Sequence, residues 1–473
     1  MPPSRPWGHC VRPTDHRPDV RAPSPSGRAR HVRSATSDQR GHPTADRKPT
    51  VCVVGQGYVG LSVAAAAATA GLRVHGVDRD VERVRALAAG RLAVPAVDEP
   101  TFALAVETGR LTFGTEAEVA SEADVTLICV PTPVVDHRPD LSAVEAAAAA
   151  VAPHLRPGAL VILESTTYPG TTEEIVTPLL ERGGLRTGHD LLVAYSPERI
   201  DPGNRKYGLA NTPRIVAGVT PEAAEAAADF YARITDEVHI LSSCRAAELA
   251  KLLENTFRMV NIALVNELAT VCAEQGIAVW EVIEAAATKP FGFMAFQPGP
   301  GVGGHCIPLD PQYLAWQSRH ATGRRFRLLE LAQDINIDMP VYVANRIGEA
   351  LNAHSLAVRG ADVLALGVTY KPDVGDLRES AAVQVLRRLL RNGAKVRFHD
   401  PFVDRLKLDG TVLERSAVND AALLAADCVA LLTPHGTYDI EQIVACSRLL
   451  FDARNATGRL RAGGTCLDRV VVL

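Results

Sequence analysis

One segment of the chain combines a possible nucleophile with glycines that would expose it, the run PGPGVGGHCIPLD over Pro298–Asp310. A lone cysteine is more often a small buried hydrophobe than a reactive thiol. Here the glycines strip side chains away so that a ligand can lie against the backbone, and they place Cys306 at an accessible turn. The setting is polar, and Asp310 follows four residues later. We therefore predict that Cys306 is a nucleophile that binds its substrate covalently. His305 is expected to point away from the thiol and to shape the site or contact the substrate.

A second glycine-rich segment, GQGYVG over Gly55–Gly60, follows an apolar run and opens an alanine-rich stretch. Glycines at these spacings permit a tight turn and let backbone N–H groups approach a pyrophosphate at a helix N-terminus. Asp78 ends the next apolar run, where a carboxylate can accept hydrogen bonds from an adenosine ribose and repel a 2′-phosphate. The pattern predicts an NAD site, with Arg79 and Arg83 leaving room for NADP.

The elements that must position these residues can be read from the hydrophobic pattern. From Thr50 onward, short β-branched runs alternate with alanine-rich segments, which is typical of a parallel sheet with crossover helices. A helix is expected at Leu61–Ala70. The strands expected in the first block, which ends near residue 238, are Val51–Val54, Arg73–Val77, Val125–Val130, Leu160–Leu163 and Leu191–Tyr195. The strands expected in a second block are Val363–Val368, Val396–His399, Cys428–Leu432 and Leu449–Phe451.

Between the two blocks the signal is helical, from Cys244 to about Ala287 and again, after a Gly- and Pro-rich loop, through roughly His354. Four residues of the first stretch recur at spacings of three and four and so share one helix face: Glu248, Lys251, Leu252 and Asn255. The predicted fold class is α/β, with two Rossmann-like, doubly wound parallel-sheet domains joined by a helical core. The predicted divisions are 1–48, 49–238, 239–355 and 356–473.

Composition excludes several classes of protein. The net charge of −4 gives no argument for binding nucleic acid or an anionic membrane surface, and no stretch after the leader is apolar enough to span a membrane. The nine cysteines lack paired CxxC spacing, which indicates reduced thiols, no metal site and a cytoplasmic protein. Residues 1–48 are rich in Arg, Pro, Ser and His and lack the apolar segment of a secretory signal. We interpret them as a disordered leader.

The chain resembles the UDP-glucose/GDP-mannose dehydrogenase family from about residue 50 to the C-terminus. The stretches that carry the resemblance occur in order along the chain: VCVVGQGYVGL, CVPTP with PDLS, ESTTYPGTT, YSPERIDPGN, AELAKLLENTFRMVNIALVNELA, GPGVGGHCIPLDP, YKPDVGDLRES and FDARNA. Several long motifs matched in order are much stronger evidence than any one of them. The resemblance implies an N-terminal NAD domain, a helical dimerisation core and a C-terminal domain that binds the nucleotide diphosphate of a sugar substrate.

The resemblance also implies roles for individual residues. Cys306 would be the nucleophile, Lys251 and Asn255 would stabilise oxyanions, Asp310 would orient water or relay protons, and Glu198 and Thr167 would assist thioester hydrolysis. The residues expected to contact NAD are Gly55, Gly57, Tyr58, Val59, Gly60, Asp78, Arg83, Thr132, Thr167 and Arg378. The residues expected on the substrate side are Glu198, Arg199, Lys251, Asn255, Gly301, Gly303, Lys371 and Arg454.

The implied reaction is a four-electron oxidation of a sugar CH₂OH to a carboxylate through a thioester on Cys306. Each stage puts negative charge on the former alcohol oxygen, so a cation and an amide donor one helical turn apart should stabilise it. Two alternatives are open: a two-electron β-hydroxyacid-type dehydrogenase, which would need no cysteine loop, and a non-catalytic nucleotide-sugar sensor. The first is disfavoured by the GGHCIPLD loop, and the second by intact Cys306, Lys251, Asn255 and Asp310.

The loop Lys289–Met294 resembles the branch of the family that acts on UDP-N-acetylhexosamines, particularly UDP-N-acetylglucosamine. UDP-glucose, UDP-N-acetylmannosamine and GDP-mannose are the alternative substrates, because pocket shape at C2 is poorly readable from sequence. A homodimer is the expected assembly. The helical middle carries apolar residues beyond what one two-domain cleft needs to cover: Leu249, Leu252, Leu253, Val260 and Leu264.

Overall fold

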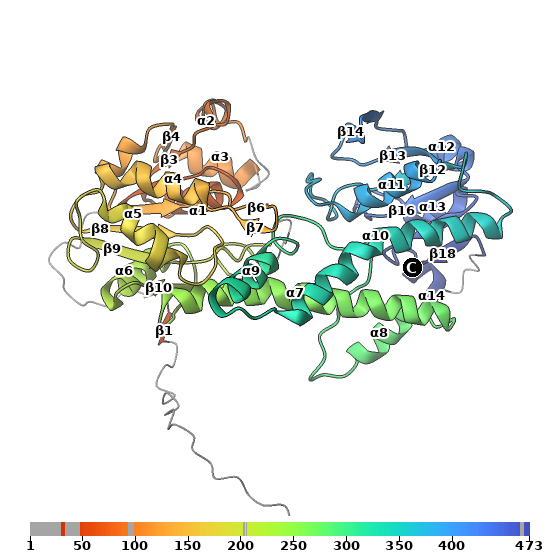
Figure 1. The fold of residues 1–473 in the computed structure, drawn as a ribbon. Coiled ribbons are helices and arrows are strands. Elements are labelled where there is room, and N and C mark those ends of the chain that lie inside the picture. The colour runs from red at the N-terminus through yellow and green to blue at the C-terminus, as the bar shows by residue number, and fades with distance from the viewer. Residues whose placement is uncertain (1–29, 34–47, 93–98, 202–203, 205, 464–467) are drawn as a thin grey trace, which may run out of the picture.

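Two sheet-containing units flank a pair of long helices (Figure 1). The computed structural model describes residues 30–33, 48–92, 99–201, 204, 206–463 and 468–473 of the 473-residue chain. The red-to-yellow part of the chain forms the first unit and the blue part the second, and the green helices run beneath both. The predicted α/β class with two doubly wound sheets is confirmed.

The first sheet has the order β1-β11-β10-β9-β8-β5-β2-β3-β4. Its strands are β1 (Arg30–Arg33), β2 (Thr50–Val54), β3 (Arg73–Val77), β4 (Leu111–Gly114), β5 (Val125–Ile128), β8 (Ala159–Leu163), β9 (Leu191–Tyr195), β10 (Arg214–Gly218) and β11 (Glu237–Ile240). Pairing is parallel except between β9 and β10 and between β1 and β11. The chain leaves β2 toward β3 and β4 and returns to the other side of β2 at β5. The crevice at this reversal is where doubly wound sheets bind ligands.

Helices cover both faces of this sheet, and two core clusters of mainly Val, Leu, Ile and Ala fill the space between the layers. The helices are α1 (Tyr58–Thr69), α2 (Val81–Ala88), α3 (Glu99–Glu107), α4 (Ser142–Val151), α5 (Thr177–Glu181) and α6 (Pro221–Tyr231). Short turns of 3₁₀ or π helix occupy Ala117–Glu122, Ala152–His154 and Thr172–Val176. A small hairpin, β6 (Val134–Val135) with β7 (Arg138–Pro139), projects from the carboxyl side of β5 toward the second unit (Figure 1).

The middle of the chain is helical as predicted. It comprises α7 (Cys244–Glu274), α8 (Val279–Ala287), α9 (Asp310–Thr322) and α10 (Arg327–Ala353). The Ser243 side chain caps α7 by accepting a hydrogen bond from the Ala246 N–H. Helices α7 and α10 pack against each other along the base of the molecule, and the cysteine loop runs between them and α9.

The second sheet is parallel throughout, in the order β13-β12-β16-β17-β18. Its strands are β12 (Asp362–Leu366), β13 (Lys395–His399), β16 (Cys428–Leu431), β17 (Leu450–Asp452) and β18 (Val470–Val472). The accompanying elements are α11 (Ala381–Arg391), the hairpin β14 (Arg405–Leu408) with β15 (Thr411–Glu414), α12 (Asp420–Ala425), α13 (Ile440–Cys446) and α14 (Gly458–Ala462). The chain reverses direction across this sheet between β12 and β16. Each sheet therefore has its own ligand-binding crevice.

The structure differs from the sequence prediction in several elements, including four strands that were not predicted, β4, β10, β11 and β18. The predicted leader, residues 1–48, falls mostly outside the described residues, but Arg30–Arg33 form β1 and pair with β11 at the sheet edge. Helix α1 begins at Tyr58 rather than Leu61, because Gly57 already serves as its N-cap. Among the described residues, no helix is long and apolar enough to cross a membrane.

Candidate active site

Four of the predicted catalytic side chains meet where α7, the cysteine loop and the first turn of α9 converge. The backbone N–H groups of Leu309 and Asp310 donate to the Cys306 carbonyl at 3.2 and 2.9 Å, which fixes the turn before α9. Lys251 and Asn255 are buried one turn apart on α7, and Asn255 Nδ2 donates to Asp310 Oδ2 at 2.6 Å. The Lys251 charge acts on both Cys306 and Asp310. The structure thus brings together the predicted nucleophile, the cation, the amide and the carboxyl.

Cys306 is the only exposed thiol among the cysteines that the structure describes. One side of it reaches solvent, but protein atoms crowd its other sides, and this desolvation raises the pKa of the thiol above its ordinary value. The neighbouring Asp310 raises it further, whereas Lys251, Arg378 and Arg258 lower it. The thiolate, which is the reactive form, is therefore favoured by these cations and opposed by Asp310 while that group is ionised.

Asp310 is a buried carboxyl whose desolvation raises its pKa to about 6. The Lys251 charge and the hydrogen bond from Asn255 act in the opposite direction and limit the shift. A carboxyl with a pKa near 6 exchanges its proton readily at neutral pH, which suits a group that takes and returns protons.

Glu198 stands at the end of a buried chain of charges beneath the cleft. Its Oε2 accepts from Arg214 Nη1 at 2.8 Å, and Arg214 Nη2 donates to Glu164 Oε1 at 2.7 Å. Burial opposes the charge on Arg214, but the two acids raise the pKa of the guanidinium well above its usual value. The Arg214 group also lies over the Tyr231 ring, at 4.7 Å from its centroid. Arg214 therefore holds Glu198 in one orientation.

The other oxygen of Glu198 is engaged as well. Its Oε1 accepts from the backbone N–H groups of Arg199 and Ile200 at 2.6 and 2.5 Å. Arg199, predicted on the substrate side, directs its guanidinium to the Glu254 carboxylate on α7 at 2.8 Å and to the Pro213 carbonyl. In this structure the side chain of Arg199 joins the loop after β9 to α7.

Thr167 lies in the loop after β8 and is fully buried, at 0% exposure. Its hydroxyl donates to the Glu248 carboxylate on α7 at 3.4 Å. Glu248 also accepts from the Gly170 N–H at 2.6 Å and from the Thr172 N–H and hydroxyl at 2.9 and 2.7 Å. Burial raises the pKa of Glu248 to about 7. Thr167 is thus held to α7 one helical turn before Lys251.

Each of the three glycines of the first loop is required for a different physical reason. Gly55 has φ +93°, and a Cβ on it would lie 2.4 Å from the Cys129 carbonyl oxygen. A Cβ on Gly60 would lie 1.8 Å from the Gly55 carbonyl oxygen, so this glycine allows the helix to pack on its own loop. A Cβ on Gly57 would meet nothing within 4 Å. The open space at Gly57, at the N-terminus of α1, fits the pyrophosphate of a dinucleotide.

Asp78 follows β3 at the same crevice and is buried. Its Oδ2 accepts from the Gln56 N–H and from Arg83 Nη1, both at 2.8 Å, and its Oδ1 accepts from the Asp80 N–H at 2.9 Å. A carboxylate has about four acceptor positions, so capacity for a ribose hydroxyl remains. Asp78 therefore also anchors the glycine loop, a role that its sequence position did not reveal.

The glycine loop and the cysteine loop face a common cleft. Desolvation raises the pKa of Tyr58, and the charges of Glu198, Asp201 and Cys306 and the Tyr370 phenol raise it further. Tyr58, the first residue of α1, is thus close enough to Cys306 to be affected by its charge. Three other residues predicted to contact the cofactor have protein partners: Val59 packs on the first core, Thr132 hydrogen-bonds to Tyr313 of α9, and Arg378 pairs with Asp376 at 2.6 Å.

Two cations reach the cleft from the second unit. Lys371, after β12, pairs across the cleft with Asp201 of the first unit at 2.7 Å. Arg454, after β17, lies over Gly299, where a Cβ would come within 2.3 Å of the guanidinium. Desolvation lowers the pKa of Arg454 to about 10, and within the described part of the chain no carboxylate forms an ion pair with it. A desolvated arginine of this kind fits an anionic ligand.

Gly301 and Gly303, predicted on the substrate side, have protein atoms where a side chain would begin. A Cβ on Gly301 would lie 3.0 Å from the Asn336 carbonyl oxygen. A Cβ on Gly303 would lie 2.7 Å from the Glu379 carbonyl oxygen and 2.8 Å from the Cβ of Tyr370. Gly304 has the Tyr370 ring at a similar distance. These glycines allow the cysteine loop to pack closely against the second unit, and their contact with substrate stays a prediction.

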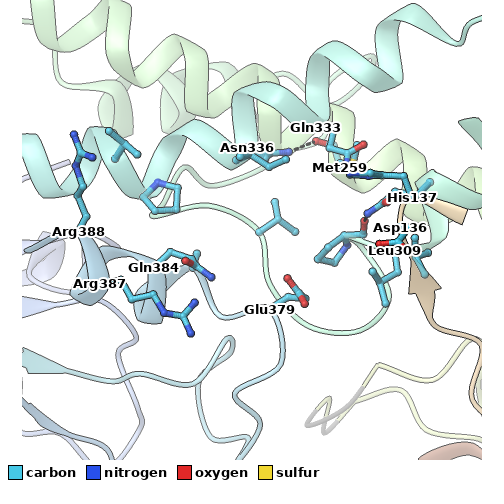
Figure 2. A pocket seen from close by; sticks show the side chains of 18 of the residues that line it. Asp136, His137, Met259, Leu309, Gln333, Asn336, Glu379, Gln384, Arg387 and Arg388 are labelled. Carbon is cyan, nitrogen blue, oxygen red and sulfur yellow. Dashed lines mark hydrogen bonds between the residues drawn. The ribbon is translucent and has the colours of Figure 1, made fainter. Parts of the chain in front are cut away.

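A cavity of about 720 Å³ opens beside the cysteine loop rather than over Cys306. Figure 2 shows Gln384, Arg387 and Arg388 of α11 on one side and Asp136 and His137 of the β6–β7 hairpin on the other, with α10 along the top. Val302, Pro308 and Leu309 connect it to the cysteine loop. It marks the space between the two units.

Sequence reasoning missed four residues of this site. Glu164 and Arg214 form the buried charge network behind Glu198, Glu248 binds Thr167, and Tyr370 packs on the cysteine loop. A usable signal existed for Glu248, which shares a predicted helix face with Lys251 and would be costly to bury unpaired. Glu164 and Arg214 are fifty residues apart, and nothing local connects them.

Comparison with known proteins agrees with this geometry. The chain matches three models of the UDP-glucose/GDP-mannose dehydrogenase family: the NAD binding domain over residues 49–235, the central domain over 245–338 and the UDP binding domain over 364–459. The chain belongs to the UDP-glucose/GDP-mannose dehydrogenase family. It is an NAD-dependent nucleotide-sugar dehydrogenase, and the predicted family, cofactor and enzyme class are confirmed.

Similar relatives come from archaea and bacteria. The chain is 36% identical over 418 residues to a UDP-N-acetyl-D-mannosamine dehydrogenase of Methanococcus aeolicus, covering 86% of this chain and 91% of that protein. It is 38% identical over 409 residues to the enzyme so named from Salmonella typhimurium, covering 82% and 94%. A solved UDP-D-ManNAc dehydrogenase from Pyrococcus horikoshii superimposes with a TM-score of 0.78 at 34% identity, covering 86% and 95%.

Proposed function

We propose that this enzyme oxidises the C6 hydroxymethyl group of a UDP-N-acetylhexosamine to a carboxylate through a thioester on Cys306. The observation that carries the proposal is the cluster of Cys306, Lys251, Asn255 and Asp310, in which an exposed thiol lies beside a buried cation, an amide and a carboxyl with pKa about 6. The consumption of one sugar and one water yields one uronate, with four electrons removed in two hydride transfers. NAD supplies the hydride acceptor in each transfer.

The residues around Cys306 fit the first half of this reaction. As C6 becomes an aldehyde, the alcohol proton needs an acceptor, and Asp310 is a carboxylate above its pKa of about 6. The Cys306 sulfur then forms a C–S bond to the aldehyde carbon, and negative charge develops on the carbonyl oxygen. Lys251 supplies a cation for that charge, and Asn255 supplies the amide hydrogen that its bond to Asp310 leaves over.

The second half converts the thiohemiacetal into product. Loss of a hydride from C6 and a proton from oxygen gives the thioester, whose C–S bond breaks when water attacks the carbonyl carbon. We assign Glu198 to orienting that water, because Arg214 and two backbone N–H groups hold its carboxylate in one orientation. Thr167, held to α7 by Glu248, is assigned to the same step.

Lys371 and Arg454 are the groups that we assign to the substrate diphosphate. Both reach the cleft from the carboxyl ends of strands in the second sheet, and Arg454 has no carboxylate partner among the described residues. Lys371 would exchange Asp201 for a phosphate oxygen when substrate binds. We assign the NAD side of the site to the glycine loop, Asp78 and Tyr58 of the first unit; the open space at Gly57 supports this assignment.

The sugar is proposed to be UDP-N-acetylmannosamine, on the names of the relatives that match most of the chain. UDP-N-acetylglucosamine is the second candidate, favoured by the sequence of the loop Lys289–Met294. The two differ only in configuration at C2, a contrast that pocket shape decides.

NADH production with a panel of nucleotide sugars tests these assignments. We expect two NADH per sugar consumed and a uronate product, with UDP-N-acetylmannosamine giving the highest kcat/KM. Cys306→Ala should still bind NAD but make no uronate, and Cys306→Ser should stop at or before acyl transfer, because an alkoxide is a poorer leaving group than a thiolate. One NADH per sugar, or near-native uronate formation by the alanine variant, would refute the thioester route.

We also propose that two copies associate along α7. Its residues Leu249, Leu253 and Leu264 are 43–62% exposed and follow one side of the helix. Leu252 was predicted to join them but is fully buried within its own subunit, and Val260 is half-buried. Leu328, Leu331 and Ile337 of the adjacent α10 extend the apolar surface, each more than half exposed. An apolar surface along two packed helices fits a two-fold dimer.

A further inference from the structure

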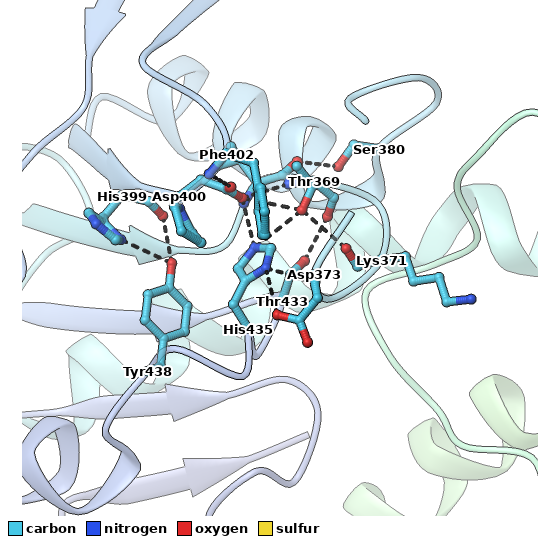
Figure 3. A network of polar contacts seen from close by, with 12 residues as sticks. Thr369, Lys371, Asp373, Ser380, His399, Asp400, Phe402, Thr433, His435 and Tyr438 are labelled. Atoms are coloured by element: carbon cyan, nitrogen blue, oxygen red, sulfur yellow. Dashed lines mark hydrogen bonds and ion pairs between the residues drawn. The ribbon is translucent and has the colours of Figure 1, made fainter. Parts of the chain in front are cut away.

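A buried histidine in the second unit has no part in the chemistry described so far. His435 follows β16, and its side chain is 0% exposed. It lies where the chain reverses across the second sheet, beside the loops after β12 and β13. Figure 3 shows it at the centre of a polar network that includes Thr369, Asp373 and Asp400.

The hydrogen-bond partners of His435 indicate which of its two ring nitrogens carries the hydrogen. Nδ1 accepts from the backbone N–H of Asp373 at 3.0 Å, so Nδ1 carries no proton in this arrangement. Nε2 lies 2.9 Å from Asp400 Oδ2 and donates to it. Desolvation opposes the charge on Asp400, but the hydrogen bonds from His435 and from the Phe402 and Val368 N–H groups lower its pKa to about 2. The imidazole therefore bridges the Asp400 carboxylate and the backbone of the loop at Asp373.

The loop that this bridge holds carries Lys371. Two residues after Lys371, Asp373 adopts φ +60°, which a non-glycine residue rarely takes, and its side chain accepts from the Gly436 N–H at 2.8 Å. Two residues before Lys371, the Thr369 hydroxyl donates to the Lys371 carbonyl at 3.2 Å. The backbone of Lys371 is thus clamped on both sides by the network, while its side chain points away from it, toward Asp201 (Figure 3).

The same loop reaches the nucleophile. Tyr370 precedes Lys371, and its side chain packs against Gly303 and Gly304 of the cysteine loop. The Gly304 N–H also donates to the Arg378 carbonyl at 3.0 Å. The loop of Lys371 therefore contacts the cysteine loop through the Tyr370 side chain, while Lys371 itself reaches the proposed diphosphate site.

We propose that His435 is a positioning residue that holds the loop of Tyr370, Lys371 and Asp373 in the shape that grips the substrate diphosphate. The bond from the Asp373 N–H to Nδ1 is the operative link, and Asp400 fixes the ring from the other side. The proposal rests on the assignment of Lys371 to the diphosphate in the proposed function. His435 itself contacts no substrate.

The two ring nitrogens allow matched variants. His435→Asn retains an acceptor near the position of Nδ1, and His435→Gln retains a donor near the position of Nε2. We expect His435→Gln to raise KM for the nucleotide sugar and Kd for UDP about tenfold, the loss of one well-placed hydrogen bond, with kcat and Kd for NAD within about twofold. His435→Asn should keep KM within about threefold of the wild type. Equal KM values for the two variants, or a change in melting temperature alone, would overturn the proposal.

Two further variants separate this inference from the proposed function. Because His435 acts through Lys371, His435→Gln should add nothing to KM in a Lys371→Met background. If Lys371→Met alone leaves UDP binding unchanged, the diphosphate assignment fails, whereas additive effects of the two substitutions show that His435 acts elsewhere. Thr369→Val removes the second clamp and should reproduce the rise in KM even where a His435 variant does not fold. An unchanged KM in Thr369→Val would contradict the positioning role of the network.

Discussion

Arg214 is predicted to be among the most sensitive positions of the first unit, although it touches no reacting atom. It is 2% exposed and bridges two carboxylates, Glu164 at 2.7 Å and Glu198 at 2.8 Å. Arg214→Met would leave two acids at the edge of the core without a counter-charge. Breaking a buried pair by removing one partner costs about 3–5 kcal/mol, and a unit of this size loses about 2–4 °C in Tm per kcal/mol. We therefore expect a fall in Tm of roughly 6–20 °C.

The loss of Tm in Arg214→Met should depend on pH in a definite direction. Burial raises the pKa of Glu164 above its ordinary value, and the Arg214 charge acts against that shift. Without the guanidinium the folded-state pKa rises further above the unfolded value. Such a carboxyl destabilises the fold above its folded pKa and ceases to do so as the pH falls below the unfolded value. The Tm difference between wild type and Arg214→Met should therefore be larger at pH 8 than at pH 5, as measured by calorimetry.

Two companion variants sharpen the test. Arg214→Met with Glu164→Gln removes one of the stranded charges and should recover part of the lost Tm. Arg214→Lys keeps the charge but not the two-pronged geometry, so it should fall between the wild type and the methionine variant in Tm while lowering kcat, because Glu198 loses its fixed orientation. A methionine variant that melts within about 2 °C of the wild type at both pH values would show that the charge network is not what stabilises this unit.

Three other outcomes are expected. Gly57→Ala should raise Kd for NAD about tenfold or more and leave Tm unchanged, because its Cβ enters the space proposed for the ligand. Gly60→Ala should lower Tm sharply, because its Cβ meets a carbonyl oxygen at 1.8 Å. Titration calorimetry measures the first effect and melting curves the second, and similar effects of both variants would contradict the assignment. If Asp310 accepts the alcohol proton, kcat should fall as the pH drops through about 6, and Asp310→Asn should lose this limb together with about 10²–10⁴ of the rate; a retained limb would identify another group. Leu253→Glu should give monomers in sedimentation, with Leu252 unavailable as a partner contact; an unchanged dimer would place the interface elsewhere.

The fold class was predicted from the local hydrophobic pattern, and the members of the central cluster from the resemblance to the family, with which the local spacing agrees. Lys251 and Asn255 share a helix face by spacing alone, and Asp310 follows Cys306 within one turn. Arg214 and His435 were out of reach, because each acts through partners that only the tertiary fold brings near. The sequence did not fix which residues of α7 face outward to within one residue. Both Leu252 and Leu253 were predicted on the outer surface, but Leu253 faces solvent and Leu252 is buried.

The glycines show the same limit in another way. Gly57 and Gly303 both stand in glycine-rich loops that precede functional residues, and the sequence gives both the same interpretation. In the structure the first borders open space and the second borders the Glu379 backbone and Tyr370. A glycine in the sequence indicates that a side chain is excluded at that position. Whether a ligand or the protein itself excludes it depends on how distant segments pack.

The contact between Gly303, Gly304 and Tyr370 has a consequence for engineering substrate choice. The loop of Cys306 and the loop of Lys371, which we propose to bind the diphosphate, pack against each other here, although about seventy residues of sequence separate them. Chimeras that exchange the whole C-terminal domain between family members would combine a Cys306 loop from one parent with a Lys371 loop from another, and the two would not fit each other. A hybrid should turn over only when the segments around Cys306 and Lys371 are transplanted from a single parent. For substrate choice, the two contacting loops therefore have to be exchanged together, although they belong to different domains.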